Sequence, residues 1–184
     1  MNGGPLARFF DRATRRTFVD LALDDPPAAR YLADLLTRFA RADALRAADL
    51  LPGARLDTVV DAWLHIERGW DMSSPGFDPG RERTVRRHIG DYTLFMTGVF
   101  RDHVDRLAVA SYYRREGQRA YRFLAETTHG GAAIEAALFR RLSAHFEQYA
   151  GALSYMRKVY FRRDEIPSEI GLDDPFIRQL LLGT

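Results

Sequence analysis

One acid, Asp91, lies between two glycines, Gly90 and Gly98, in the nearly unbroken apolar run at residues 86–100. A helix that is apolar on every side must be buried. Asp91 is therefore either a carboxylate held inside the protein by a specific partner or a capping residue at a helix break. The pattern favours the cap, because glycine followed by aspartate commonly ends one helix and begins the next.

The buried alternative predicts a polar locus around Asp91. In one continuous helix, Arg87 and His88 share its face. Later groups that can donate a hydrogen bond to this carboxylate are Tyr112, Tyr113, Arg115, Arg119 and Tyr121. We take as a candidate ligand or partner pocket His88, Asp91, Tyr92, Tyr113 and Arg119.

A metal site is a weaker alternative. Glu126 and His129 have the three-residue spacing that places a carboxylate and an imidazole on one face of a helix in di-metal bundles. Such bundles need two of these pairs, and the sequence has one. Beside Gly130, His129 fits better as a residue that favours the carboxyl end of a helix dipole. The chain has no cysteine, which excludes thiolate ligands and cysteine nucleophiles.

The charge pattern disfavours nucleic acid as a partner. There are 27 basic and 25 acidic residues, giving a net charge of +2, and all but one of the basic residues are arginine. The arginine clusters are interleaved with acids, which is typical of solvated faces of mixed charge.

No serine lies in a glycine elbow, and no glycine-rich phosphate loop occurs. The sequence therefore carries no signature of catalysis.

Apolar residues recur at three and four positions almost throughout, and this period predicts an all-α bundle of six or seven helices in a single domain, residues 1–184. We expect a buried central helix over 84–100 and one long amphipathic C-terminal helix over 132–161. The main loop is expected at 72–80, and a tail with a short terminal helix at 164–184. The other expected helices cover about 6–18, 26–50, 56–64 and 112–124.

No stretch approaches the roughly 20 apolar residues that a membrane span needs, and the first residues lack the apolar core of a secretion signal. We therefore expect a cytoplasmic protein without a membrane partner. Residues 175–182 and the helix over 132–161 offer apolar surfaces to a second copy of the chain, which predicts a homodimer.

Two resemblances bear on function. The Gly90-Asp91-x-x-Leu-Phe-x-x-Gly-x-Phe100 segment, with residues 111–121 and the C-terminal stripe, resembles a small bacterial all-helical family that has no assigned activity. This resemblance covers about residues 31–160 and implies fold and ancestry without catalytic residues. More locally, residues 89–98 are similar to the glycine-kinked distal helix of heme oxygenases, in which an aspartate organises water over the heme. That likeness implies a heme-ligating histidine near the amino terminus, whereas the first histidine here is His65.

These observations rank three functions. The leading hypothesis is a non-enzymatic interaction or regulatory protein, a homodimer without a cofactor, in which the locus around Asp91 orders the core or lines a partner pocket. The alternative is a heme-oxygenase-like enzyme or small-ligand binder that uses Asp91 with Tyr113 and Arg119 around a cavity. The third is nucleic-acid binding through clustered arginines.

Overall fold

In the computed structural model, the described residues are 4–40, 81–128, 132–162, Ile166 and Ile170, and every regular element among them is a helix. The all-α class is therefore confirmed. The helices are α1 (Pro5–Asp20), α2 (Pro26–Phe39), α5 (Arg81–Val99), α6 (Arg101–Arg106), α7 (Ala110–Thr127), α8 (Ala133–Ala144) and α9 (Phe146–Tyr160). Four expectations lie outside the described residues: the helix at 56–64, the continuation of the second helix towards 50, the loop at 72–80 and the terminal helix in the tail.

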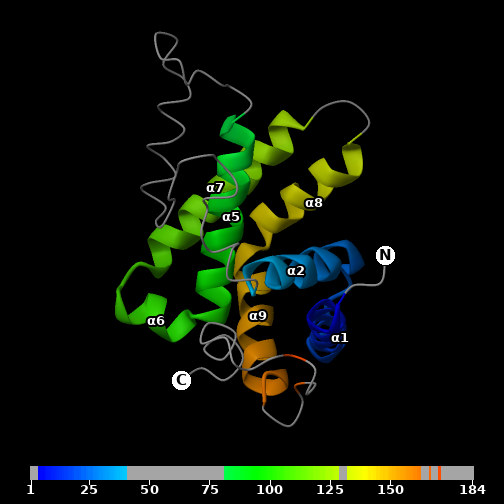
Figure 1. The fold of residues 1–184 in the computed structure, drawn as a ribbon. Coiled ribbons are helices and arrows are strands. Elements are labelled where there is room, and N and C mark those ends of the chain that lie inside the picture. Colours follow the sequence, from blue (N-terminus) through cyan, green and yellow to red (C-terminus); the bar gives the residue numbers. More distant parts are fainter. Residues whose placement is uncertain (1–3, 41–80, 129–131, 163–165, 167–169, 171–184) are drawn as a thin grey trace.

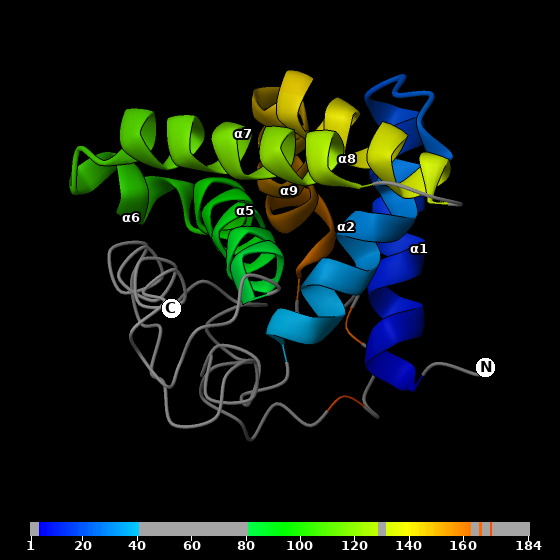
Figure 2. The same ribbon diagram turned by 90° about the horizontal axis from the view of Figure 1, so that it is seen from above.

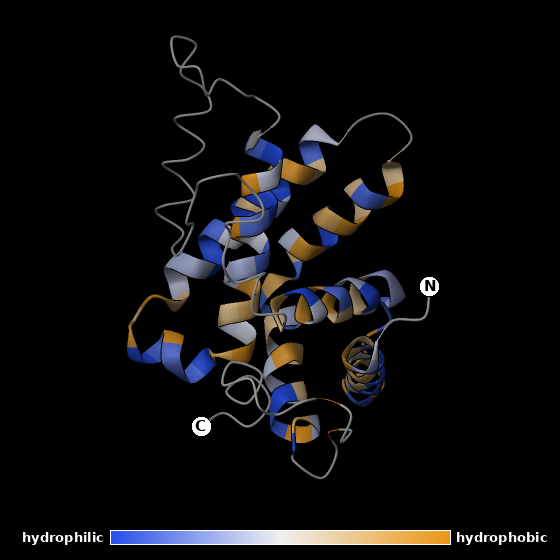
Figure 3. Ribbon diagram, in the orientation of Figure 1, coloured by the Kyte–Doolittle hydropathy of each residue, from blue (hydrophilic) through white to orange (hydrophobic). Residues whose placement is uncertain are grey.

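The helix α5 packs against both α7 and α9, and α8 packs along α7 (Figure 1, Figure 2). The α1–α2 pair lies beside α9 and meets α8 through α2. Each helix carries both polar and apolar residues (Figure 3). This is the pattern of amphipathic helices, which bury one apolar face. On α5, the apolar residues Val85, Ile89, Leu94 and Phe95 are buried. No helix of the described residues has the length and apolar character needed to cross a membrane.

A carboxylate cap begins the second helix. The Ala28 amide donates a hydrogen bond of 3.0 Å to the Asp25 side chain, and Pro26 occupies the first helical position. Proline suits this position because its fixed φ is helical and its missing N–H would have no partner there. The start of α2 is thus encoded locally.

The prediction of a single long helix over 132–161 is wrong, because two helices, α8 and α9, cover this range. The helix breaks at His145, where φ is −111° and ψ is 28°, and the chain continues as α9. The His145 amide still donates to the Arg141 carbonyl at 2.8 Å, so the chain bends without losing that bond. The two halves pack on different neighbours, α8 on α7 and α2, and α9 on α5 and α1. One straight rod does not follow both surfaces, and the apolar spacing continues across the bend.

Two glycines of α5 allow close helix packing. A Cβ at Gly98 would lie 2.5 Å from the Leu153 Cβ of α9 and 3.1 Å from the Ala150 carbonyl oxygen. A Cβ at Gly90 would lie 2.8 Å from the ring of Tyr121 on α7. The helix is continuous through both positions, so these glycines serve close approach by neighbouring helices and do not end the helix.

We predict that Gly98→Ala lowers the free energy of unfolding by about 2 kcal/mol, because the overlap with Leu153 outweighs the roughly 1 kcal/mol that alanine gains in helix propensity. The matched control is Gly151→Ala in α9, where an added Cβ meets nothing within 4 Å. That change should raise stability by about 0.5–1 kcal/mol. Urea denaturation measures both, and equal stabilisation by the two changes would contradict the close approach at Gly98.

Candidate functional site

The Asp91 side chain lies inside the protein, in the middle of α5. It is 1% exposed, and α5 runs without a break from Arg81 to Val99. A capping residue must lie at the start of a helix, where amides lack partners. The cap interpretation is therefore wrong, and Asp91 is the buried, partnered acid of the alternative.

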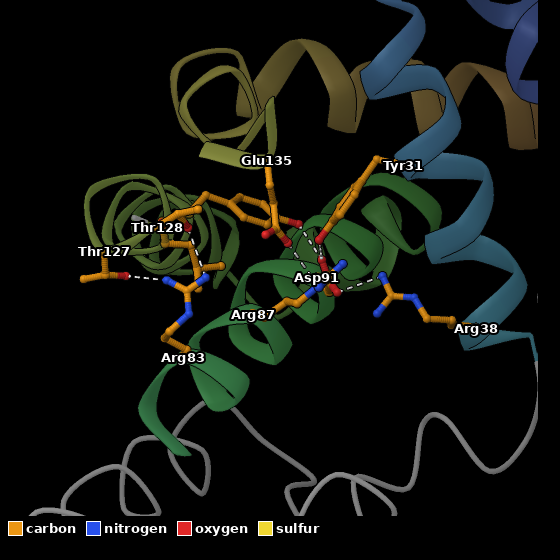
Figure 4. A network of polar contacts seen from close by, with 10 residues as sticks. Tyr31, Arg38, Arg83, Arg87, Asp91, Thr127, Thr128 and Glu135 are labelled. Atoms are coloured by element: carbon orange, nitrogen blue, oxygen red, sulfur yellow. Dashed lines mark hydrogen bonds and ion pairs between the residues drawn. The ribbon is translucent and has the colours of Figure 1, made fainter. Parts of the chain in front are cut away.

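Three donors from two other helices meet this carboxylate (Figure 4). One oxygen, Oδ1, accepts hydrogen bonds from the hydroxyls of Tyr31 on α2 and of Tyr121 on α7, the latter at 2.9 Å. The other oxygen, Oδ2, lies 2.9 Å from Nη2 of Arg38, also on α2. We call these four residues, Tyr31, Arg38, Asp91 and Tyr121, the Asp91 cluster; it joins α2, α5 and α7.

Aromatic rings and a second guanidinium surround the Asp91 cluster. The rings of Tyr31 and Tyr121 meet edge to face, with centroids 6.4 Å apart, and both pack on Phe139 of α8. The guanidinium of Arg87 lies 5.7 Å from the ring centroids of Tyr31 and Phe139. Its Nη1 is 3.6 Å from a Glu135 carboxylate oxygen, and both side chains are partly exposed. The positive charge therefore lies towards the surface, while the negative charge of Asp91 is enclosed.

The protonation states follow from burial and from Asp91. Burial raises the pKa of the Tyr31 and Tyr121 hydroxyls, and the negative charge of Asp91 raises both further. Burial alone would lower the pKa of Arg38, but the attraction of Asp91 more than compensates, so this pKa is raised. Both tyrosines thus remain neutral donors and Arg38 remains charged, which is the combination a buried carboxylate needs.

Asp25 has a similar environment at the start of α2. Its Oδ1 caps that helix, and its Oδ2 accepts hydrogen bonds from the Tyr149 hydroxyl at 2.7 Å and from Arg141 Nε at 2.8 Å. Burial, followed by this hydrogen bond, raises the pKa of Tyr149. A tyrosine and an arginine therefore satisfy this aspartate too, and the contact ties α2 to α8 and α9.

The structure divides the pocket expected from the sequence. His88 is buried and stacks between Phe39 and Tyr92, at centroid distances of 6.4 and 6.1 Å. Tyr113 meets the edge of Tyr92 at 6.0 Å, and Arg119 is exposed. The expectation that Tyr113 and Arg119 surround Asp91 is therefore wrong.

Of the five later donors considered for Asp91, only Tyr121 bonds it. Sequence reasoning does not identify Tyr31 and Arg38 as partners, because both lie far before Asp91 in the chain, Tyr31 by 60 residues. A signal was present, since the two are seven residues apart and so share one face of α2 with leucines. A tyrosine and an arginine on an otherwise apolar face indicate a buried polar partner.

No group of three or more His, Cys, Asp or Glu that could hold a metal ion occurs among the described residues. Glu126 is exposed, and His129 lies outside the described residues. Among the described residues, two cavities are lined by residues outside the Asp91 cluster. One, of about 240 Å³, opens beside Asp25, Arg141 and Tyr149, and the other, of about 210 Å³, lies between α7 and α8.

Comparison of the chain with family models, curated proteins and solved structures found no match. Both carboxylate oxygens are bonded to donors, two buried tyrosines and the partly exposed Arg38, and the Asp91 side chain is almost inaccessible to solvent. This arrangement holds helices together, and it presents no free base to a substrate.

We predict that Asp91→Asn lowers the free energy of unfolding by about 3 kcal/mol, because it removes the charge opposite Arg38 and brings an amide N–H towards donors. The loss lies at the low end for a buried pair, since the Arg38 side chain is 44% exposed. The matched control is Asp34→Asn on the exposed face of α2, which should change stability by less than about 0.5 kcal/mol. Similar unfolding midpoints for the two variants would refute the buried pair.

Alkaline pH should destabilise the protein through Tyr31 and Tyr121. The unfolded chain loses these protons near pH 10, whereas the folded chain holds them to higher pH, so their stabilisation is complete below pH 10 and declines above it. The free energy of unfolding should fall by up to about 1.4 kcal/mol per pH unit for each tyrosine. Urea titrations from pH 8 to 11 measure the slope, which the double change Tyr31→Phe, Tyr121→Phe should reduce. Stability that stays constant through this range would contradict the assignment.

Proposed function

We propose that this protein is a non-enzymatic interaction or regulatory protein of the cytoplasm, that it acts as a homodimer, and that the Asp91 cluster orders its core. The observation that supports the proposal is that both Asp91 oxygens already have donors, two buried tyrosines at Oδ1 and the partly exposed Arg38 at Oδ2. An acid with these partners stabilises the folded scaffold, and we therefore expect residues on the surface to bind the partner.

The surface charge favours a protein partner over a polyanion. Several arginines form ion pairs with acids, among them Arg114 with Glu147 at 3.0 Å and Arg15 with Asp11 at 2.9 Å. A nucleic-acid interface needs a face on which positive charge is left unbalanced. Mixed charge of this kind is common around interfaces between proteins.

We place the first turns of α8 in the contact between the two copies. Ile134 is 82% exposed, more than any other large apolar side chain among the described residues. Leu138, one turn later on α8, is partly buried and packs against the core. The exposed apolar start of α8 thus continues directly into packed structure, as expected for a surface covered in an oligomer.

Light scattering after gel filtration should give a mass twice the 21.0 kDa of the chain. Ile134→Glu should weaken dimerisation by about tenfold or more, since a charge would replace a buried apolar contact. The control is Leu107→Glu, at a residue that is 57% exposed and follows α6, far from α8 in both ribbon views. A monomer at all concentrations, or equal effects of the two changes, would overturn the proposal.

The scaffold role of Asp91 is separable from dimerisation. Because Asp91 is 1% exposed, Asp91→Asn should leave the dimer dissociation constant unchanged at temperatures where the variant remains folded. Loss of dimerisation by a fully folded Asp91→Asn protein would show that the cluster acts at the interface itself.

A further inference from the structure

A cavity of about 210 Å³ lies between α7 and α8. Close to it the two helices are joined by a hydrogen bond of 2.8 Å, which the Ser143 hydroxyl of α8 donates to the Gln118 carbonyl of α7. This bond fixes the spacing of the walls. The residues that line the cavity are Arg122, Ala125, Glu126, Arg140, Ser143 and Ala144.

Arg122 and Arg140 face this cavity from opposite helices. Neither forms an ion pair with an acid of the described residues, in contrast to Arg114 and Arg141, which bond Glu147 and Asp25. Glu126 lies one turn after Arg122. No guanidinium nitrogen of Arg122 lies within 4 Å of a Glu126 carboxylate oxygen, so these two described residues form no ion pair. Two guanidiniums without a carboxylate partner among the described residues therefore line this cavity.

The charges and size of the cavity define its ligand. Two arginines and one glutamate leave one net positive charge, which suits a molecule with a single anionic end. Guanidinium groups bond phosphate oxygens in pairs, with a planar geometry that matches the phosphate. Pockets for drug-sized molecules usually measure about 300–1,000 Å³, so this cavity suits a smaller ligand.

We propose that this cavity binds a small phosphate-bearing molecule, whose phosphate lies between Arg122 and Arg140. Glu126 then accepts a hydrogen bond from a hydroxyl or ammonium group of the same molecule. The site depends neither on the Asp91 cluster nor on the dimer, so it adds a ligand to the proposed interaction function.

The test is a calorimetric titration with inorganic phosphate at constant ionic strength, on the full chain. We expect saturable binding of one phosphate per chain, weakened about tenfold or more by Arg122→Gln and by Arg140→Gln, because each change removes a charge-assisted hydrogen bond. The control is Arg30→Gln, at an exposed arginine of α2 outside the cavity, which should bind phosphate like the unchanged protein. Helicity measured by circular dichroism verifies that each variant is folded.

Glu126→Gln gives a result of opposite sign. Removal of the negative charge should tighten phosphate binding severalfold, because the anion no longer meets a like charge. Weaker binding by this variant would overturn the proposal, as would unsaturable binding by the unchanged protein or an equal loss in Arg30→Gln.

A second measurement identifies the source of the phosphate. Co-sedimentation with vesicles that contain phosphatidic acid, lost in the double change Arg122→Gln, Arg140→Gln, would assign the site to a lipid headgroup. Phosphate binding without co-sedimentation would assign it to a free molecule.

Discussion

The enclosed carboxylate of Asp91 is the interaction on which the rest of the structure depends. An ionised acid inside a protein is costly unless donors surround it. Here the donors come from α2 and α7, so the charge can be accommodated only when both helices are docked on α5. Hydrophobic burial alone would tolerate small shifts between these helices, whereas the carboxylate requires one arrangement. We infer that the Asp91 cluster sets the register of the bundle.

Tyrosine and aspartate recur as partners in this fold. Asp25 and Asp91 each accept a hydrogen bond from a buried tyrosine and pair with an arginine, and Asp20 accepts from two tyrosines on α9. A phenol suits this role because its ring packs in the core while its hydroxyl bonds the acid. Each contact links helices that are distant in sequence. The aromatic content of the chain therefore serves polar connections as well as apolar packing.

Much of the fold is predictable from the sequence because it depends on local rules. The period of apolar residues defines the helices, and the Asp25–Pro26 pair defines where α2 begins. The bend at His145 is not predictable in this way, since neither glycine nor proline marks it and only the packing of α8 and α9 on different neighbours requires it. The locus at Asp91 was identifiable as an acid in an apolar run, and Tyr121 was among its expected donors. Tyr31 and Arg38 were not, because their proximity exists only after the helices pack.

The central claim is that one carboxylate couples α2 to α7. A double-mutant cycle between Arg38→Gln and Tyr121→Phe tests it most directly, because the two side chains reach different oxygens of Asp91. We predict a coupling energy of about 1 kcal/mol or more in urea denaturation, which should disappear when the cycle is repeated with Asp91→Asn. Strictly additive effects in the presence of Asp91, or coupling that survives its replacement, would contradict this account.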